Sequence, residues 1–536
     1  MALREVRIAF LLPGTTLPSW QVNAMRHAME IPGVRLVVMG IPGLVSSEHL
    51  TGGIRGYLEK RALDLLCSKA HLREDASDLL GQTPVVAIGS DGLTPADLAQ
   101  FNPYEPEMTF SFLPPFAPSS VQNEQPIWQF NIAGRGLLPT GLPVMGSHLL
   151  AGPSARTALV GVDGKTGLGL DISLTDQQGA RSIDALLYGA AWLPARMIVE
   201  RVMNIGSTSN EITNSIDDEV SMMQLANLTI RLEIARWQRR NEIEGATGSW
   251  NIGILYQPIT VLLEEEPSMN VRWLPSPSTG NHRMEPFGYT AEDGQLNVIY
   301  RKKSKAKEHD TLARLRPKSD SVLKRSRSML STQADLEYPF VVERPDGAYV
   351  IVSYPHQGRT ELFKVAPTND QLHHIKILMN RAISSPTLTE HEGRWWLFGT
   401  DPDAPDNILL AFHSPDFDGP FQPHTLNPIK VGSVGVRPAG TFFRNGEQLW
   451  RPTLDKSETD TMAVILAQVE DLTPTSFREK TGKRVAGFWG SVYGHGVRTL
   501  STMGDITLID GVRLANRPKS ATEPKQPRER RPSSEP

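Results

Sequence analysis

The chain has 536 residues, which is longer than one ordinary domain and predicts two to four domains. Its 55 Lys and Arg residues nearly balance its 59 Asp and Glu residues, and a net charge of −4 argues against a chain that as a whole binds nucleic acid or a membrane surface. Hydrophobic residues at 39% exclude global disorder. The single cysteine, Cys67, excludes an internal disulfide framework and a Cys-rich zinc site.

The N-terminus contains an apolar run of only five residues, from Ile8 to Leu12, which Pro13-Gly14 ends. Such a run is too short for the core of a signal peptide or for a membrane span. We therefore expect a cytoplasmic protein without a membrane span.

Short apolar runs alternate with helical patterns over the first 200 residues or so. The predicted elements are strands at Val6–Leu12, Val34–Met39, Val85–Ile88 and Met108–Leu113, and helices at Trp20–Met29, Ile54–His71 and Pro95–Phe101. Alternation of strands and helices favours a parallel sheet with helices on its faces. We expect an α/β domain over residues 1–205.

A long amphipathic pattern follows this domain. Residues 214–244 keep apolar side chains at helical spacing, and Gly245 and Gly248 end the pattern. The segment 206–248 is therefore predicted to be a helical connector.

A unit of about fifty residues repeats after Trp250. Each copy has a residue followed by Pro (Thr in the last copy), then a strand, a polar-Gly turn and a second strand. The residues at the repeated position are Glu285, Tyr338, Ser385, Arg437 and Arg498, and the turns are Asp293-Gly294, Asp346-Gly347, Glu392-Gly393, Asn445-Gly446 and Met503-Gly504. Units of this length with paired hairpins are typical of propeller blades, so we expect a five-bladed β-propeller over 249–515. The Pro-rich tail, 516–536, has few apolar residues and is expected to be disordered.

Several strings in the repeat region resemble a known family. They are MEPFGY, EYPFVVE, SPTLTEHEGRWWLFGT, GPFQPHTLNPIKVGSVGVRPAGTFF, LTPTSF and RTLSTMGDITLIDG. This half of the chain is similar to the N-terminal propeller of glucosamine inositolphosphorylceramide transferases and their bacterial relatives. It is similar, more distantly, to five-bladed glycosidases of the family 43 type. The resemblance implies a carbohydrate-active protein of glycan or glycoconjugate assembly.

The first half resembles a formyltransferase N-terminal domain. Residues 104–112, YEPEMTFSF, are similar to the strand that leads into the active site of that family. Active members follow this strand with Asn-x-His, whereas the corresponding stretch here is Trp128-Gln129-Phe130, which has no group that can move a proton. The resemblance implies a formyltransferase-like α/β domain, and the missing Asn-x-His argues against formyl transfer.

The residue before the repeated Pro faces the mouth of the propeller channel in the similar families, so we expect the five repeated residues to form a ring there. Five-bladed glycosidases need two carboxylates. Relatives carry Asp at the first and third positions of the ring, where this chain has Glu285 and Ser385. The candidate catalytic residues are therefore Glu285, as a base, and Asp455, as a second carboxylate elsewhere in the blades.

Two arginines give the ring a different chemistry. Guanidinium groups pair bidentately with phosphate or carboxylate, so Arg437 and Arg498 predict an anionic ligand, and Arg451 is a further candidate. The alternative is that the arginines pair with Glu285 or Asp455 and close the channel. The other candidate binding residues are Tyr338, Ser385 and His282.

Residues 301–327 hold eleven Lys or Arg residues against three acids. The segment has no interleaved aromatic residues and falls between the first two blades. We interpret it as a solvated loop and predict no nucleic-acid partner.

Three functions remain open at this point. The first is a glycosyltransferase-like protein whose propeller recognises a sugar, sugar phosphate or nucleotide sugar through a phosphate or carboxylate. The second is a non-catalytic glycan-binding or scaffold protein with two degenerate enzyme domains, which Ser385 and the missing Asn-x-His favour. The third is formyl or acyl transfer to an amino sugar. No cofactor and no metal are predicted, and the oligomeric state stays open.

Overall fold

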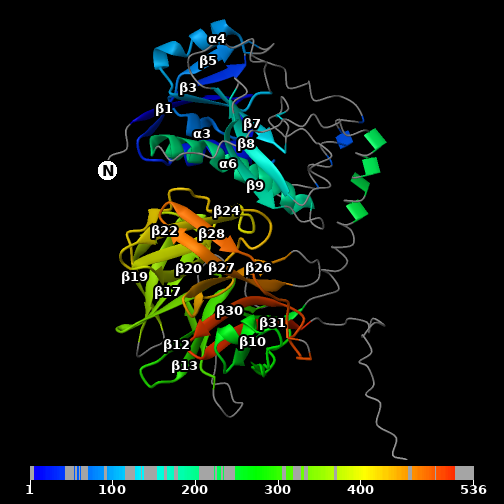
Figure 1. Ribbon diagram of the computed structural model, residues 1–536, viewed down its shortest axis with the longest axis vertical. Coiled ribbons are helices and arrows are strands. Elements are labelled where there is room, and N and C mark those ends of the chain that lie inside the picture. The colour runs from blue at the N-terminus through cyan, green and yellow to red at the C-terminus, as the bar shows by residue number, and fades with distance from the viewer. Residues whose placement is uncertain are drawn as a thin grey trace, which may run out of the picture.

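The computed structural model describes two domains (Figure 1). Isolated residues are described between 54 and 65 and between 222 and 234, and the continuous described ranges are 5–42, 70–89, 93–114, 127–133, 136–137, 154–161, 166–173, 179–203, 248–304, 309–317, 327–330, 336–366, 371–456, 462–488 and 490–513. The predicted helix at 54–71 and the connector at 206–248 lie mostly outside these ranges, and the tail at 516–536 lies wholly outside them.

A seven-stranded sheet forms the centre of the first domain, with strand order β5-β3-β1-β6-β7-β8-β9. The strands are β1 (Val6–Leu11), β3 (Val34–Pro42), β5 (Val85–Ile88), β6 (Met108–Ser111), β7 (Ile127–Ile132), β8 (Ser154–Gly161) and β9 (Thr166–Ser173). The strands from β5 to β7 pair in parallel, and β8 and β9 add an antiparallel hairpin at one edge. The side chains of β1 alternate between two cores, because both faces of the sheet are covered.

Helices pack on both faces of this sheet. The helical elements are α1 (Ser19–Met29), α3 (Ser77–Leu80), α4 (Pro95–Ala99), η1 (Asn102–Tyr104) and α6 (Gly179–Val202), and a small ribbon pairs β2 (Thr16–Pro18) with β4 (Arg73–Asp75). Helices α1 and α6 contact each other and share one core with Ile8 and Phe10. Helix α4 brings Leu98 to the other core, beside Ala9 and Leu11.

The strands and helices predicted at β1, α1, β3, β5, α4 and β6 are present, with small differences at their ends. Strands nevertheless predominate among the described elements of this domain. The antiparallel hairpin of β8 and β9 was not predicted. Gly167 and Gly169 lower the strand propensity of β9, although Leu168, Leu170 and Ile172 alternate as in a strand.

Five antiparallel sheets form the second domain, and each is one blade. Blade 1 holds β12 (Asn281–Thr290), β13 (Leu296–Ser304), β14 (Thr311–Leu315) and β15 (Arg327–Leu330). Blade 2 holds β16 (Phe340–Arg344), β17 (Gly347–Tyr354), β18 (Arg359–Val365) and β19 (Leu372–Met379). Blade 3 holds β20 (Ser384–His391), β21 (Arg394–Thr400), β22 (Ile408–Ser414), β23 (Gln422–Pro423) and β24 (Lys430–Val431). Blade 4 holds β25 (Phe443–Asn445), β26 (Gln448–Asp455), β27 (Ala463–Thr473), β28 (Ser476–Lys480) and β29 (Arg484–Val485).

Blade 5 is built from both ends of the propeller. It holds β30 (Val497–Met503), β31 (Ile506–Arg513), β10 (Ser249–Leu255) and β11 (Arg272–Trp273). Strand β10 pairs along its whole length with β31, so the first propeller strand completes the last blade. This pairing closes the ring of blades, and the five-bladed propeller predicted from the repeat is confirmed. Two single turns, η3 (Ile259–Leu263) and η4 (Pro355–Gln357), lie in connections between strands.

The five predicted turns each join the first two strands of a blade. Each contains a glycine in the left-handed region, which a residue without a Cβ enters freely. The φ values are 73° at Gly294, 132° at Gly347, 70° at Gly393, 62° at Gly446 and 55° at Gly504.

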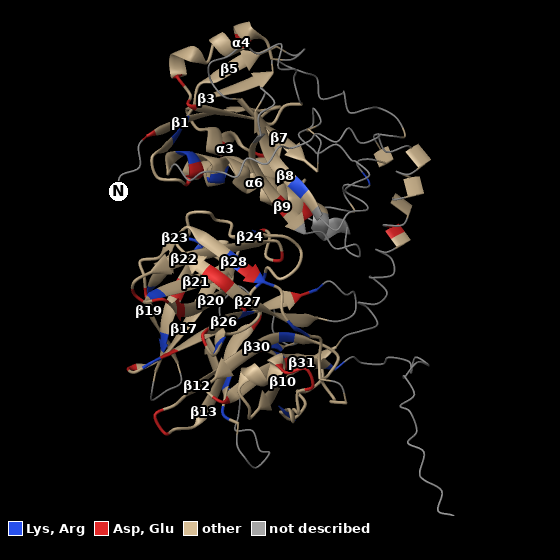
Figure 2. Ribbon diagram, in the orientation of Figure 1, with Lys and Arg blue, Asp and Glu red and all other residues tan. Residues whose placement is uncertain are grey.

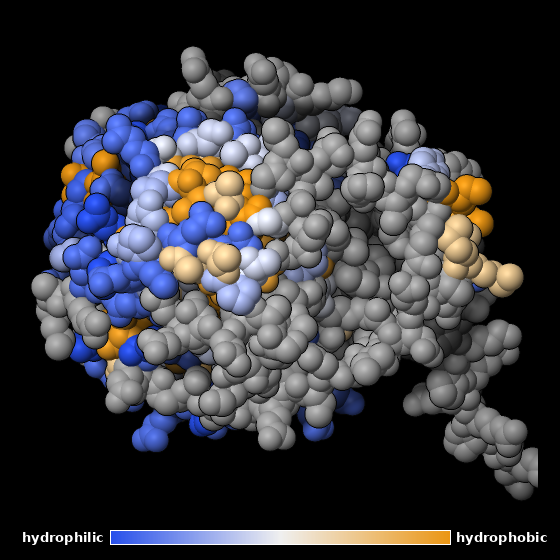
Figure 3. All heavy atoms as spheres, turned by 90° about the horizontal axis from the view of Figure 1, so that it is seen from above, coloured by the Kyte–Doolittle hydropathy of each residue, from blue (hydrophilic) through white to orange (hydrophobic). Residues whose placement is uncertain are grey.

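The two domains contact each other through helices α1 and α6 and blade 3. Arg381, just before β20, donates a hydrogen bond to Glu30 at 3.1 Å, and its guanidinium lies 5.2 Å from the ring centroid of Trp192. Trp192 in turn stacks on His27 with a centroid distance of 3.9 Å. The N-terminal domain therefore lies beside blade 3, with blades 1 and 5 on the far side of the propeller (Figure 1). When the molecule is seen from above, with the N-terminal domain towards the viewer, the described surface is mostly hydrophilic with smaller hydrophobic areas (Figure 3).

Candidate functional site

Three of the five repeated residues, which lie in or just before the first strand of a blade, have an unusual backbone conformation. Glu285, Tyr338 and Ser385 have φ values of 54°, 51° and 52°, in the left-handed region that residues other than Gly rarely adopt. Register shifts in β12, β20 and β30 form bulges at the repeated position. Bulges re-aim side chains, and strained non-Gly residues cluster at functional sites. The ring that these residues form with the charged groups around them, called the mouth below, is therefore the candidate site.

Asp510 on β31 links the last blade to the first. Its Oδ2 accepts the N–H of Glu285 at 2.8 Å, and its Oδ1 accepts the N–H groups of Arg498 at 3.1 Å and Thr499 at 2.6 Å. Burial raises the pKa of this carboxyl to about 6. Asp510 was not among the site residues predicted from the sequence. It is the one acid of β31, whose other charged residue is the terminal Arg513.

The carboxylate of Glu285 is completely buried and ion-paired. Its Oε2 accepts the N–H of Tyr338 at 2.6 Å, and its Oε1 lies 2.7 Å from Arg498 Nη2 and 3.6 Å from Arg301 Nη1. Burial acts to raise the pKa of Glu285, but the two arginines and the hydrogen bond outweigh it and hold the pKa below its usual value. Glu285 is thus a buried anion that connects Arg498 to Tyr338. Its ion pair with Arg498 is one of the pairings that we considered as the alternative to ligand binding.

The phenol of Tyr338 connects three blades beneath the mouth. Its oxygen accepts the N–H of Gly440 at 2.6 Å and a hydrogen bond from the Thr387 hydroxyl at 3.1 Å. Burial raises the pKa of Tyr338, so the phenol keeps its proton. A side chain at Gly440 would overlap the backbone of Leu500, so glycine is what allows blades 4 and 5 to meet here.

Arg437 contacts two partly exposed carboxylates of the mouth. Its Nε donates to Ser385 Oγ at 2.9 Å, its Nη2 donates to Glu337 Oε1 at 3.2 Å, and its Nη1 lies 3.7 Å from Asp406 Oδ1. The side chains of Glu337 and Asp406 are 30% and 26% exposed, against 10% for Arg437. Carboxylates are therefore present at the mouth, although the third repeated position, where relatives carry Asp, is Ser385.

Two further cations complete the mouth. Lys456 Nζ lies 2.9 Å from both carboxylate oxygens of Asp406, and Arg301 lies 3.2 Å from Glu337 and 2.6 Å from Asp310. Burial lowers the pKa of Lys456 to about 8, although Asp406 opposes this shift. The interpretation of 301–327 as a solvated loop is wrong where the segment forms β13 and β14, because Arg301 is only 12% exposed in a blade strand.

The mouth contains cations and carboxylates that lie next to each other, an arrangement that we call a mosaic. The cations are Arg301, Arg437, Lys456 and Arg498, and the carboxylates are Glu285, Asp310, Glu337 and Asp406. Basic and acidic residues are likewise interspersed over the propeller (Figure 2). A hydroxyl group can donate to a carboxylate and accept from a guanidinium at the same time, so such a mosaic suits a ligand with many hydroxyls.

Three predicted site residues are held by other groups. Arg451 is completely buried, binds Glu479 at 2.8 and 2.9 Å and has no surface for a ligand. Asp455 is 2% exposed and pairs with Arg484 at 2.6 Å. Nδ1 of His282 accepts a backbone N–H of β10 at 3.4 Å, and burial lowers its pKa.

Among the described residues, no group of three His, Cys, Asp or Glu side chains is arranged to hold a metal ion. Within the same ranges, no helix combines the length and apolarity needed to cross a bilayer. The cytoplasmic location stays a prediction.

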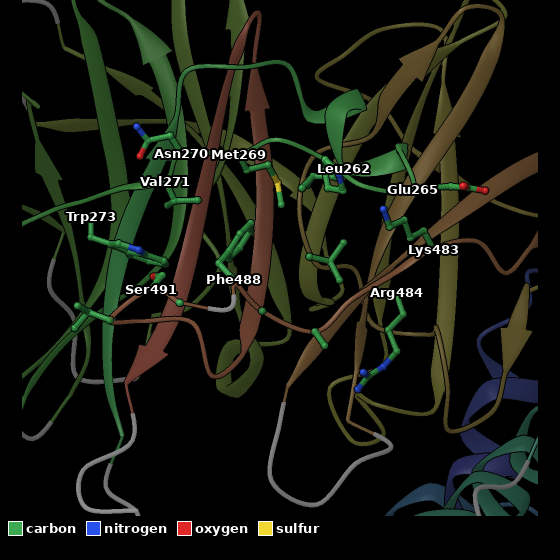
Figure 4. A pocket seen from close by; sticks show the side chains of 16 residues that line it. Leu262, Glu265, Met269, Asn270, Val271, Trp273, Lys483, Arg484, Phe488 and Ser491 are labelled. Atoms are coloured by element: carbon green, nitrogen blue, oxygen red, sulfur yellow. The ribbon is translucent and has the colours of Figure 1, made fainter. Parts of the chain in front are cut away.

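A separate cavity of about 780 Å³ opens between blades 4 and 5 (Figure 4). It is lined by described residues between 262 and 273, by 483–488 and by 490–492, and none of the ring residues is among them.

Part of the propeller matches a known family. The family described as glucosamine inositolphosphorylceramide transferase 1, N-terminal, matches residues 266–486, which run from β11 to β29. The transferase 1 of that name from Arabidopsis thaliana is 26% identical over 198 residues, or 34% of this chain and 26% of the relative. The one from Oryza sativa subsp. japonica is 25% identical over 194 residues, or 33% and 26%. The chain thus spans about a quarter of the length of these curated plant relatives.

Solved structures with similar regions include three glycan-processing proteins. Zg3597, a family 117 glycoside hydrolase of Zobellia galactanivorans, has a TM-score of 0.32 at 11% identity, covering 40% of this chain and 73% of its own. The exo-β-1,3-galactanase 1,3Gal43A of Clostridium thermocellum has a TM-score of 0.32 at 12% identity, with coverage of 42% and 58%. A protein of the GH130 family of mannoside phosphorylases and glycoside hydrolases scores 0.34 at 13% identity, with coverage of 46% and 86%. The propeller assignment rests on the five sheets themselves.

The formyltransferase resemblance of residues 1–205 is not supported by these comparisons, since the family match begins at residue 266. Trp128-Gln129-Phe130 lies in β7, where Trp128 is opposite Phe110 and Gln129 is opposite Ser111 of β6. The predicted strand is β6, and its neighbour β7 holds Trp128-Gln129-Phe130 in place of the Asn-x-His of active formyltransferases.

Proposed function

We propose that the protein is carbohydrate-active and recognises a saccharide at the mouth of its propeller, in glycan or glycoconjugate assembly. The similarity of residues 266–486 to a transferase family named for a glucosamine-bearing lipid supports the substrate class. The observation that carries the proposal is Arg437, held by Ser385, Glu337 and Asp406. This arrangement places donors and acceptors within reach of the hydroxyls of one sugar ring.

An anionic substituent on the sugar is part of the proposal. Arg437 and Lys456 both contact Asp406, which is partly exposed. A phosphate or carboxylate that displaced Asp406 would gain two cations at once, and charge-assisted hydrogen bonds of this kind are the stronger ones. Arg498 is less available, because the buried Glu285 carboxylate already binds it. The proposed ligand is therefore a sugar phosphate, nucleotide sugar or uronic acid.

Titration calorimetry on the full chain tests this proposal. The panel holds glucosamine 6-phosphate, glucuronate, UDP-N-acetylglucosamine and the uncharged sugars glucosamine and cellobiose. We expect Arg437→Gln to weaken binding of the anionic ligands at least about tenfold, as loss of a charged hydrogen bond does. Asp406→Asn should keep or raise the affinity, because the competitor for Arg437 loses its charge.

Arg444→Gln is the matched control, because Arg444 is an exposed arginine on the same blade. It should bind as the wild type does. The proposal is wrong if no saccharide binds, or if Arg437→Gln and Arg444→Gln bind equally well.

A glycosyl-transfer or hydrolysis reaction is the second candidate, which Glu337 and Asp406 favour. Carboxyl pairs that act on glycosidic bonds stand roughly 5–9.5 Å apart. Glu337 and Asp406 contact two different nitrogens of the Arg437 guanidinium, at 3.2 and 3.7 Å, which brings the two carboxylates near each other. Glu285 is proposed here as the residue that orients the ring, since its carboxylate has no exposed surface.

Matched variants separate an enzyme from a non-catalytic glycan-binding protein. In an enzyme, Glu337→Gln and Asp406→Asn should each lose turnover of a bound nucleotide sugar and keep its binding. A binding protein has no turnover to lose. Formyl or acyl transfer is not proposed, because Trp128-Gln129-Phe130 offers no group that can move a proton.

A further inference from the structure

Exposed apolar side chains are concentrated on a helical segment outside the sheets of both domains. The described residues between 222 and 234 are helical, and they form the short green pieces of ribbon at the right of Figure 1. Thirteen large hydrophobic residues are exposed within the described ranges, and four of them fall in this segment. They are Met222, Met223, Ile230 and Ile234, with exposed fractions of 39%, 82%, 60% and 51%. Such a concentration indicates an interaction surface.

Exposed residues of this segment follow heptad spacing. Successive positions are four, three and four residues apart, and the side chain at each of them is exposed. The four residues, which we call the seam, are Met223, Asn227, Ile230 and Ile234. In sequence the same spacing continues to Val220 on one side and to Trp237 on the other. Alternating steps of three and four residues mark the a and d positions along which the helices of a coiled coil pack.

A different side of the same helix contacts its own chain. Ala226 and Glu233 are half-buried, and Thr229 is buried. Nε of Arg61 donates a hydrogen bond to the Glu233 carboxylate at 2.7 Å. Because these contacts hold one side of a helix with 3.6 residues per turn, they fix its rotation and leave the seam facing solvent.

Asn227 identifies the partner as an identical helix. Because a precedes d by three residues, Asn227 and Ile234 are a positions, and Met223 and Ile230 are d positions. An Asn at a single a position fixes the register and the oligomeric state of a coiled coil, by pairing with the same Asn of a parallel partner. An antiparallel partner with Met223 opposite Ile234 would place Asn227 opposite Ile230, where a buried amide has no hydrogen-bond partner.

We propose that the seam is a dimerisation surface, on which a second copy of this chain packs its own seam in parallel as a two-stranded coiled coil. The two-fold axis of such a pair brings each seam residue opposite its own counterpart, as a symmetric dimer requires. Pairing covers the apolar side chains and gives the Asn227 amide a partner. No residue of the mouth belongs to the seam, so this proposal does not depend on saccharide binding.

Sedimentation velocity on the full chain, at concentrations from about 1 to 100 μM, tests the proposal. The wild type should sediment as a dimer at the upper end of this range. Ile230→Asp places two like charges opposite each other in one layer of the seam, and should weaken association at least about a hundredfold. Ile375→Asp on β19, where Ile375 is 46% exposed, is the matched control and should leave the dimer unchanged.

Oxidative cross-linking tests the parallel register. Asn227→Cys should form a disulfide-linked dimer, because two a residues of one layer face each other at a distance that suits the roughly 4.4–6.8 Å between the Cα atoms of a disulfide. Met222→Cys, on the same helix but outside the seam, is one control. The wild type, whose single cysteine is Cys67, is the other. Neither control should form the linked dimer.

A wild-type chain that stays monomeric at the highest concentration would overturn the proposal. Association of Ile230→Asp to the same extent as the wild type, or equal cross-linking of Asn227→Cys and Met222→Cys, would also contradict it. A monomer that binds phosphatidylcholine vesicles, and loses this binding in Ile230→Asp, would assign the seam to a lipid surface in place of a second copy.

Discussion

Asp510 and Glu285 are joined by a hydrogen bond of 2.8 Å from the Glu285 N–H to Asp510 Oδ2, which ties the last blade to the first. The Glu285 carboxylate repeats this arrangement one blade further on, where it accepts the N–H of Tyr338 at 2.6 Å. Each acid thus holds the backbone of the next repeated residue in its left-handed conformation. These two buried hydrogen bonds support the left-handed backbone at Glu285 and Tyr338.

Asp510→Asn should destabilise the protein by about 1–3 kcal/mol. The amide keeps the size of the side chain but turns an N–H donor towards backbone N–H groups that need an acceptor. The measurement is the free energy of unfolding in urea. Asp505→Asn, in the exposed turn between β30 and β31, is the control and should change stability by less than about 0.5 kcal/mol. Equal stability of the two variants would mean that Asp510 does not hold the ring.

Anion binding at the mouth should weaken as the pH rises through about 8. Burial lowers the pKa of Lys456 to about 8, so its positive charge is present below this pH and lost above it. Calorimetric titrations with glucosamine 6-phosphate from pH 6.5 to 9.5 measure the effect. Lys456→Arg should keep its affinity across this range, because arginine stays protonated.

Lys364→Arg, at an ion pair on the outer part of blade 2, is the control and should follow the wild-type profile. A flat wild-type profile up to pH 9.5 would remove Lys456 from the binding site.

Glu479 should contribute stability that is lost in acid. Burial acts to raise its pKa, but Arg451 and Lys430 outweigh burial and lower it from 4.5 to about 2. Because the pKa is depressed in the folded state, this contribution of about 3 kcal/mol is complete above pH 4.5 and disappears as the pH falls towards 2. Unfolding free energies measured between pH 2.5 and 7 should show this slope.

Glu479→Gln should flatten the acid slope and lower the stability at pH 7 by about 3–5 kcal/mol, because Arg451 is left buried without its counter-charge. The control is Glu470→Gln, which removes an exposed ion pair with Arg478 and should do neither. An acid slope that survives in Glu479→Gln would assign the effect to other carboxyls.

Arg381 should couple the two domains. Its guanidinium binds Glu30 and lies over Trp192, so Arg381→Ala and Glu30→Ala should show a coupling energy of about 0.5–1 kcal/mol in a double-mutant cycle of unfolding. Arg381→Lys should retain less than half of this coupling, because lysine loses the planar contact with the indole. A coupling energy of zero would mean that the contact does not hold the domains together.

The blades and their turns could be read from the sequence because each depends on neighbours in the chain. The Asp-Gly and Asn-Gly turns predicted hairpins, and Gly294 and Gly446 indeed take left-handed conformations. The same local pattern located Glu285 and Arg437 at equivalent positions. It could not find Glu337 and Asp406, because neither is the repeated residue of its blade.

Arg451 shows the opposite error. Its place in a blade strand close to Arg437 in sequence suggested a shared ligand, whereas the strand turns its side chain to Glu479. Sequence proximity does not define the direction of a side chain once a strand is paired on both sides.

The sequence by itself determined the five blades and the repeated residue of each, since periodicity and turn chemistry act over a few residues. Only the tertiary structure decided which charges meet. Arg498 reaches Glu285 because β10 and β31 close the ring. Arg437 contacts Glu337, which directly precedes Tyr338, and Asp406, which lies in the connection between β21 and β22. The energy of an ion pair depends on distance through space and on burial, and both exist only after the blades have packed.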